Sequence, residues 1–266
     1  MTILSAHPIA PAVRQRIEAE LRLIEEQHHV RVLFACESGS RGWGFASPDS
    51  DYDVRFVYVH QLDWYLQVEP QRDVIELPIN DELDISGWEL RKALQLLHRS
   101  NPTLLEWLCS PVIYREEIET TARLRELADQ FYFPLRVRHH YQAMAIKNNR
   151  EHLTGDLVKL KKYLYVLRPI LAMNWIDAGL GKPPMRFAEL VEGTITESAL
   201  LDEINALLKV KMQAGEAASG PRWPLIHAFI DKHLQGAERD LAYRKPAGDS
   251  QALDRLLQDA ILVGRR

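Results

Sequence analysis

Cysteine is scarce in this chain of 266 residues, which has only Cys36 and Cys109. Two cysteines are too few for a disulfide framework, and their separation does not fit the ligand spacing of a zinc site. The sequence also lacks a run of about 18 consecutive apolar residues, the length that a membrane-spanning helix needs. Its first 14 residues have no long apolar core behind a basic segment, so they do not resemble a secretory signal. These absences predict a cytoplasmic protein with reduced thiols and no membrane partner.

A net positive charge, which is common in nucleic-acid-binding proteins, is missing as well, because the formal net charge is −4 at pH 7. The sum does not exclude a local basic face, since a carboxylate-rich metal site removes positive charge from the total. With 46% hydrophobic and 26% charged residues, the composition is that of an ordinary globular protein. The length suits one large domain or two modest ones.

What the sequence does have is one stretch, residues 39–59, in which a turn of small residues precedes two carboxylates and an apolar run. Just before it, the apolar segment from Arg31 to Cys36 predicts a buried strand that ends near Gly39 and Ser40. Glycine lets a phosphate approach the backbone, and Ser40 and the N–H groups of a following short helix can donate to it. The turn is therefore a candidate phosphate site.

Two aspartates follow this turn. Alternate residues of a strand point to the same side, so Asp51 and Asp53 project together while Tyr52 and Val54 face the other way. Adjacent carboxylates repel each other unless a cation lies between them, and hard divalent ions such as Mg²⁺ prefer oxygen ligands of this kind. The order of apolar strand, Gly-Ser turn and paired aspartates predicts a two-metal nucleotide site.

These residues carry a family resemblance. Gly39-Ser40 followed by Asp51 and Asp53 resembles the nucleotidyltransferase signature of the DNA polymerase beta superfamily. More narrowly, the run from Cys36 to Tyr58 resembles the RNA repair pathway DNA polymerase beta family of predicted nucleotidyltransferases (RlaP-like). The resemblance covers most of residues 30–190, and its further segments are Gly87 to Ala93, Asn101-Pro102, Leu105 to Leu108, Ser110 to Tyr114, Lys161 to Tyr165 and Arg168-Pro169.

The resemblance implies a third carboxylate on a neighbouring strand. Asp84 is the residue that matches, because it lies between two apolar residues on a short predicted strand. Glu82 would share its face and remains the alternative ligand. By the same resemblance, Asp51, Asp53 and Asp84 are the catalytic residues and bind two Mg²⁺ (or Mn²⁺) ions, of which Asp84 binds the catalytic one.

The most basic part of the chain lies on two successive predicted helices, the first from Pro134 to about Leu153. On the second, Lys161 shares a face with Tyr165 at a spacing of four and with Arg168 at a spacing of seven. A positive face is what both a triphosphate and a nucleic-acid backbone require. The residues expected to bind the nucleotide are Gly39, Ser40, Arg41, Lys161, Lys162, Tyr165 and Arg168.

Together these features predict an α+β fold. Residues 1–115 are expected to form a polymerase-beta-like nucleotidyltransferase domain, a small mixed sheet with flanking helices, and residues 116–266 an all-helical substrate-binding domain. In the expected reaction an acceptor hydroxyl attacks the α-phosphorus of a nucleoside triphosphate and pyrophosphate leaves. The resemblance points to RNA, a tRNA-like or damaged end, as the acceptor.

Two alternatives stay open at this point. The chain is then either an RNA- or tRNA-binding protein whose repurposed site does other chemistry or none, or a transferase that modifies a protein partner. Nothing in the sequence determines which triphosphate is used or what the oligomeric state is.

Overall fold

A computed structural model describes residues 8–79, 82–155, 157–215, 218–235 and 248–263. Within these ranges the chain forms two compact units. The sheet unit comprises residues 8–42, 51–132 and 248–263, and the helical unit comprises residues 43–50 and 133–235. The domain boundary expected at residue 115 stays a prediction. By its contacts, the helix that follows residue 115 groups with the sheet unit.

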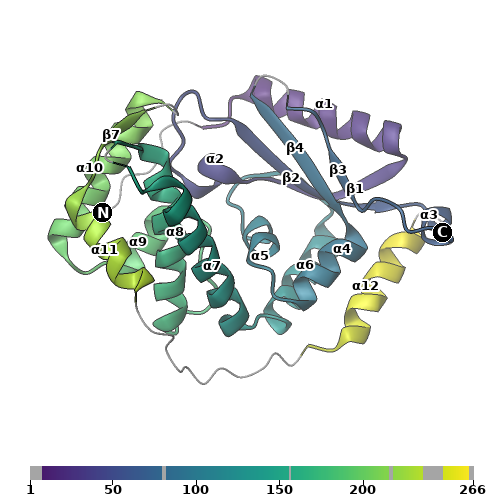
Figure 1. The fold of residues 1–266 in the computed structure, drawn as a ribbon. Coiled ribbons are helices and arrows are strands. Elements are labelled where there is room, and N and C mark those ends of the chain that lie inside the picture. The colour runs from purple at the N-terminus through teal and green to yellow at the C-terminus, as the bar shows by residue number, and fades with distance from the viewer. Residues whose placement is uncertain (1–7, 80–81, 156, 216–217, 236–247, 264–266) are drawn as a thin grey trace. The chain divides into compact units, whose positions relative to one another are not determined.

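The sheet unit is built on a five-stranded mixed sheet with the strand order β3-β4-β2-β1-β5 (Figure 1). Strands β2 and β4 are parallel, and the other neighbours are antiparallel. The sheet and its helices confirm the predicted α+β fold class. The strands are β1 (Val30–Glu37), β2 (Tyr52–His60), β3 (Val74–Glu76), β4 (Leu83–Glu89) and β5 (Ile113–Glu116).

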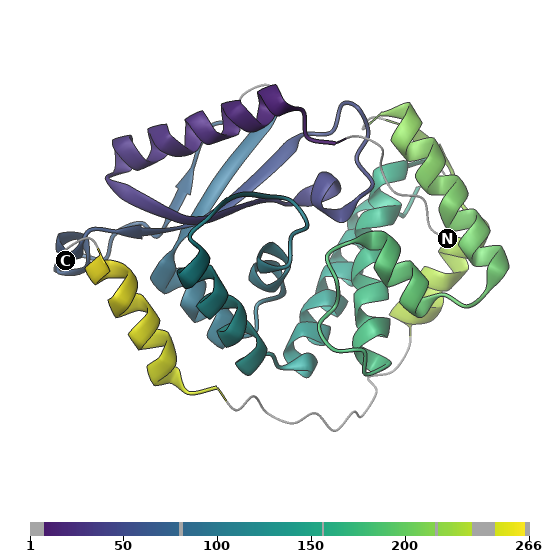
Figure 2. The same cartoon turned by 180° about the vertical axis from the view of Figure 1, so that it is seen from behind.

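Helices cover both faces of this sheet (Figures 1 and 2). On one face, α1 buries Ile17, Leu21 and Ile24, which recur at helical spacing as the sequence predicts. On the other face, helices α4, α5, α6 and α12 contact the central strands. The helices are α1 (Pro11–His28), α2 (Gly39–Trp43), α3 (Leu62–Tyr65), α4 (Leu90–His98), α5 (Pro102–Leu108), α6 (Ile118–Gln130) and α12 (Ser250–Leu262).

Helices α4 and α5 begin at side-chain caps. The Glu89 carboxylate accepts a hydrogen bond from the backbone N–H of Arg91, and Asn101 caps α5 just before Pro102. The sequence pattern predicts that the first of these helices begins at Trp88. This is wrong by two residues, because Trp88 and Glu89 extend β4 and pair with β3 and β2, respectively.

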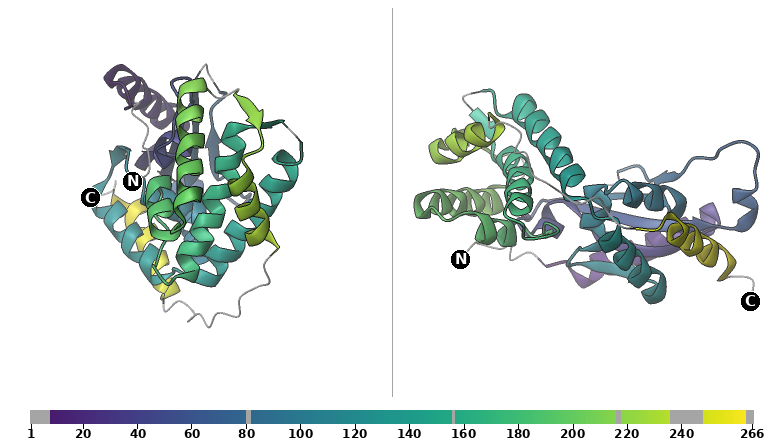
Figure 3. Two further views of the ribbon diagram at one scale, coloured as in Figure 1. Left: turned by 90° about the vertical axis from the view of Figure 1, so that its left-hand side faces the viewer. Right: turned by 90° about the horizontal axis from the view of Figure 1, so that it is seen from below.

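The helical unit contains two long helices that pack side by side, α7 and α8 (Figure 3). A buried ion pair joins them, with Arg138 Nε 2.6 Å from Asp177 Oδ1. No described helix has both the length and the apolar content needed to cross a membrane. The elements are α7 (Pro134–His152), β6 (Leu157–Lys159), α8 (Leu160–Asp177), α9 (Phe187–Thr194), α10 (Ser198–Ala214), β7 (Ser219–Pro221) and α11 (Pro224–Leu234).

A small strand pair in the helical unit departs from the sequence-based expectation. The segment from Ala214 to Pro221 is expected to be a loop, but its last three residues form β7, which pairs antiparallel with β6. The helix expected from Pro224 to Tyr243 is described as far as Leu234, and residues 236–243 lie outside the described residues. Three-residue strands give too short an alternation to be found by periodicity.

The end of β2 generates a prediction about pH. The His60 ring stacks on Trp64, with centroids 4.3 Å apart. Burial, followed by the positive field of His28, lowers the pKa of His60 from 6.5 to about 4. Because the unfolded chain binds this proton first, the contribution of His60 to stability is complete above pH 6.5 and is lost as the pH falls towards 4.

We therefore expect His60→Phe, which keeps an aromatic ring against Trp64, to flatten this part of the stability profile. The measurement is urea unfolding of both proteins at several pH values between 4 and 7.5. Parallel profiles for the two proteins would contradict the expectation.

Candidate carboxylate and phosphate site

The Gly-Ser turn and the second aspartate are in direct contact in the sheet unit. Gly39 begins α2 with a left-handed φ of 55°, and a Cβ atom built on it would lie 1.8 Å from Asp53 Oδ2. Only glycine combines this backbone conformation with this close approach. The backbone N–H of Ser38 also donates to the Asp53 carbonyl at 2.8 Å. The turn and the carboxylate, which are 14 positions apart in the sequence, therefore form one structure.

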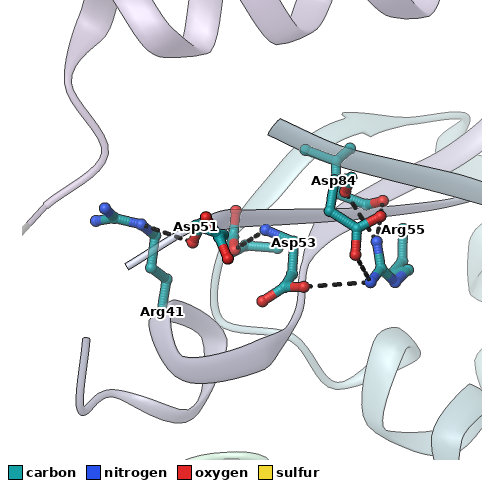
Figure 4. Close-up of polar contacts among 7 residues, drawn as sticks. Arg41, Asp51, Asp53, Arg55 and Asp84 are labelled. Carbon is teal, nitrogen blue, oxygen red and sulfur yellow. Dashed lines mark hydrogen bonds and ion pairs between the residues drawn. The ribbon is translucent and has the colours of Figure 1, made fainter. Parts of the chain in front are cut away.

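Asp84 joins Asp53 through the sheet register. The two residues are direct partners in the parallel pairing of β2 with β4, and both side chains are partly exposed (Figure 4). Their apolar neighbours, Val54 and Ile85, belong to the core that α1 covers, so by alternation both carboxylates lie on the opposite face. The structure brings two of the three predicted carboxylates together here.

A guanidinium lies between these two carboxylates. Arg55, two residues after Asp53, places Nη2 3.2 Å from Asp53 Oδ1 and 2.7 Å from Asp84 Oδ2 (Figure 4). Its other terminal nitrogen, Nη1, donates to the carbonyl oxygens of Val54 and Asp84 at 3.0 and 2.8 Å. One arginine thus compensates the repulsion that two adjacent carboxylates would otherwise feel.

Behind the turn, Glu37 is fully buried at the end of β1. Its Oε1 accepts the backbone N–H of Asp53 at 2.8 Å, and its Oε2 accepts the Tyr114 hydroxyl. Burial raises the pKa of Glu37 to about 7, against the lowering effect of these hydrogen bonds. Glu37 therefore fixes the backbone of Asp53 from inside the sheet unit.

The other predicted residues of the sheet unit lie at the rim of this arrangement. Asp51 is exposed and immediately precedes β2, and its carbonyl accepts from Arg41 Nε at 3.1 Å. The Arg41 guanidinium covers the Tyr52 ring at 3.8 Å from its centroid. Ser40 is buried. Glu82, the alternative third ligand, is exposed and precedes β4, whereas Asp84 lies within the strand.

Two of the predicted residues of α8, Tyr165 and Arg168, contact Trp43, which ends α2 and belongs to the helical unit. Tyr165 meets the Trp43 ring edge-on at 5.4 Å, and the Arg168 guanidinium lies 4.8 Å from its centroid. Arg168 is buried and donates to the Met185 carbonyl. Lys162 lies over the Tyr165 ring at 5.3 Å. Arg168 therefore supports Trp43, and Lys162 lies nearer the surface together with Lys161, which is also half-buried.

The connecting segment, residues 43–50, leads from α2 to Asp51 and is part of the helical unit. Lys211 of α10, which is 1% exposed, holds it by donating to the Phe45 carbonyl at 2.9 Å and to Ser47 Oγ at 3.2 Å. Ser50 Oγ lies 3.4 Å from the same Nζ. A buried lysine bonded to this segment indicates that its conformation is fixed by the helical unit.

Among the residues that the structure describes, no three His, Cys, Asp or Glu side chains gather as a metal cluster. The donor set at Asp53 and Asp84 nevertheless fits a divalent cation. Both are carboxylates, both side chains are partly exposed, and the Arg55 guanidinium already occupies the place of a positive charge. Asp53 and Asp84 are the residues that would hold such an ion, with Asp51 next along the chain.

Four residues of this arrangement were missed by the sequence analysis. Arg55 has a signal, since a residue two positions after Asp53 shares its face of the strand. Lys211 continues the apolar stripe of α10, which marks it as buried. Glu37 and Trp43 have no comparable signal, because their roles depend on contacts with residues far away in the sequence.

The close approach at Gly39 generates a prediction. We expect Gly39→Ala to lower the free energy of unfolding by about 1–3 kcal/mol and to abolish activity, because its Cβ would displace the Asp53 carboxylate. Gly179→Ala is the matched control, since Gly179 also has a left-handed φ, 72°, but open space around it. It should show the backbone cost alone. Full activity of Gly39→Ala would contradict this account of the site.

Known proteins resemble this chain along most of its length. The model of the RlaP family, the RNA repair pathway DNA polymerase beta family, matches residues 13–259. The uncharacterized protein YcgL of Bacillus subtilis (strain 168) is 45% identical over 252 residues, which are 94% of this chain and 96% of that protein. A solved nucleotidyltransferase-like protein from Exiguobacterium sibiricum 255-15 has 14% identity and a TM-score of 0.31 over 93% of this chain and 77% of that one, a likeness too weak to support an argument. The chain therefore belongs to the RNA repair pathway DNA polymerase beta family and is a nucleotidyltransferase.

Proposed function

We propose that the protein transfers a nucleoside monophosphate from a nucleoside triphosphate to a hydroxyl group of RNA, in a reaction that depends on divalent metal ions. The observation that carries the proposal is the Asp53 carboxylate, which lies against the glycine of the Gly-Ser turn and beside Asp84. In this arrangement a group that binds phosphate and a group that binds metal are within a few atoms of each other. A triphosphate with its metal ions needs both at once.

In this proposal Asp51, Asp53 and Asp84 hold Mg²⁺ or Mn²⁺. Bound there, the ions would activate the attacking hydroxyl and stabilise the leaving oxygen. Asp84 is preferred to Glu82 as the third ligand because it pairs with Asp53 in the sheet register. The catalytic role of the chain's own carboxylates is to fix the position at which the α-phosphorus reacts.

The phosphate side of the proposed site comes from the start of α2. At Gly39 a β- or γ-phosphate can approach the backbone, and Ser40 can donate its hydroxyl hydrogen. The Arg41 guanidinium is held by the Asp51 carbonyl and the Tyr52 ring, so it supplies a fixed positive charge next to the first aspartate. Lys161 and Lys162 are proposed to contribute further charge to the triphosphate.

Neutralising the carboxylates should abolish the transfer without unfolding the protein. We expect Asp53→Asn and Asp84→Asn each to lower the rate at least about 100-fold, because each removes a negative ligand of the ions. Asp63→Asn, at an exposed site on α3, is the control and should keep full activity. The measurement is incorporation of label from α-labelled triphosphates into RNA, with thermal melting as the check on folding. Full activity of Asp53→Asn would sink the assignment.

A basic face in the helical unit supports RNA as the acceptor. Lys147 and Arg150 are exposed near the end of α7, and Lys159 is exposed just before α8. Lys162 Nζ lies 3.1 Å from His152 Nε2, so the end of α7 and the start of α8 are close together. Burial, followed by the charges of its lysine neighbours, lowers the pKa of Lys162. The positive charges are therefore crowded, and a polyanion is the partner that relieves such crowding.

Replacing Lys147, Arg150 and Lys159 by glutamine should weaken RNA binding and make it less sensitive to salt. Each lost phosphate contact is expected to reduce the slope of log K against log salt by about 0.7 for a single strand. A triple variant of Arg22, Arg99 and Lys209, exposed cations elsewhere in the chain, is the matched control. Fluorescence anisotropy at several salt concentrations measures both. Equal slopes for the two triple variants would contradict a role of this face in RNA binding.

One labelling experiment separates the proposed acceptor from a protein acceptor. The wild-type protein is incubated with labelled triphosphates and a cell lysate, and the products are treated with ribonuclease or with protease. Label that ribonuclease releases supports RNA, and label that only protease releases would replace the proposal by modification of a protein.

A further inference from the structure

Arg55 is tied into the carboxylate pair more firmly than an ordinary surface ion pair. Its side chain is 18% exposed and makes four hydrogen bonds, two to carboxylate oxygens and two to main-chain carbonyls. The carbonyl contacts come from Val54 and Asp84, one on each of the paired strands. The guanidinium therefore spans the same gap between β2 and β4 that separates the two carboxylates.

Arg55 contacts one oxygen of each carboxylate. Arg55 engages Asp53 Oδ1, while Asp53 Oδ2 is the oxygen that lies against Gly39. At the neighbouring position Arg55 engages Asp84 Oδ2 at 2.7 Å, the shorter of its two ion-pair contacts. A cation held by Asp53 without Asp84 would leave the 2.7 Å contact of Arg55 with Asp84 in place. A cation shared by Asp53 and Asp84 meets a place that already holds a positive charge.

We propose that Arg55 is a built-in competitor of the second metal ion, so that an ion shared by Asp53 and Asp84 binds only as the guanidinium gives up Asp84. This inference rests on the proposed metal-dependent function and adds that the two ions bind one after the other. Asp51 and Asp53 would hold the first ion without loss of the Arg55 contact to Asp84. To share a second ion with Asp53, Asp84 would have to release Arg55 Nη2, while Nη1 could keep its bonds to the carbonyls of Val54 and Asp84.

The competition follows from charge alone. The guanidinium of Arg55 supplies one positive charge to the carboxylate pair. A divalent ion replaces it because two charges attract the carboxylates more strongly than one, at a cost set by the contacts that must break. A triphosphate that brings further oxygen ligands favours the exchange, since Mg²⁺ shares its coordination with substrate phosphates.

The test is metal binding in the absence of nucleotide, and it needs no activity measurement. Mn²⁺ is titrated into the full-length protein, and free Mn²⁺ is measured by electron paramagnetic resonance. The wild type should show one ion bound more tightly than a second. In Arg55→Gln the second ion should bind about tenfold more tightly or better, because a unit charge about 4 Å away has been removed. Arg55→Met serves the same purpose if the glutamine variant does not fold.

Three further variants separate the possible outcomes. Arg123→Gln removes an equal charge that is paired with Asp259 elsewhere in the sheet unit, and it should leave both affinities unchanged. Arg55→Lys keeps the positive charge and should stay close to the wild type, and a lysine variant that behaves like glutamine would assign Arg55 a structural role instead. Asp84→Asn should remove the second ion in either background.

The Mn²⁺ titration distinguishes a failure of the metal-dependent function from a failure of the competition by Arg55. If neither the wild type nor Arg55→Gln binds Mn²⁺, the metal-dependent function fails together with the competition. If both bind two ions with equal affinities, the competition is overturned and the proposed function stands. Weaker binding of the second ion by Arg55→Gln would also overturn it, because Arg55 would then help to assemble the site.

Discussion

The contact between the Asp53 carboxylate and Gly39 is the constraint on which the rest of the site depends. It requires a glycine at residue 39, because any larger side chain would collide with Asp53 Oδ2. It also requires that the end of β1 and the start of β2 stay in register. The bonds from Ser38 to the Asp53 carbonyl and from Asp53 to the Glu37 carboxylate maintain that register on both sides of the turn. The sheet therefore fixes the distance between the Gly-Ser turn and the carboxylate.

The same sheet has to hold several acidic groups close together, and it does so by different means. Burial raises the pKa of Glu37 to about 7, so near neutral pH this group is in part protonated and adds less negative charge than an ordinary glutamate. Asp53 and Asp84 are partly exposed and share the guanidinium of Arg55. Asp51 stands at the exposed start of β2. The acidic groups thus differ in environment: Glu37 is buried, Asp53 and Asp84 are paired with an arginine, and Asp51 is exposed.

The central part of the fold could be predicted from the sequence because its signals are local. Ile17, Leu21 and Ile24 recur at helical spacing, and the residues of β2 alternate between the two faces of the sheet. The paired aspartates and the Gly-Ser turn were found in the same way. The sheet register that puts Asp84 beside Asp53 was not derivable, because it arises between strands 31 positions apart. The resemblance to a family supplied that residue.

Arg55 and Lys211 show the complementary limit. Both lie on a face that strand or helix periodicity identifies. A charged residue on a predicted element is usually exposed, however, so the half-buried Arg55 and the buried Lys211 were not expected. Arg168 is the converse case. Its spacing from Lys161 favours a shared binding face. In the structure, however, Arg168 is 3% exposed and its guanidinium packs against the Trp43 ring. Spacing determines which residues share a face of an element, and only tertiary packing determines whether that face meets solvent.

The connecting segment, residues 43–50, belongs to the helical unit but is joined at both ends to residues of the sheet unit. It begins at Trp43, the last residue of α2, and it ends at Ser50, one residue before Asp51. Within the helical unit, Lys211 fixes three of its residues, and a Cβ on Gly215 would lie 2.7 Å from the Asp49 carboxylate. Both ends of the signature are therefore attached to a segment whose shape the helical unit sets.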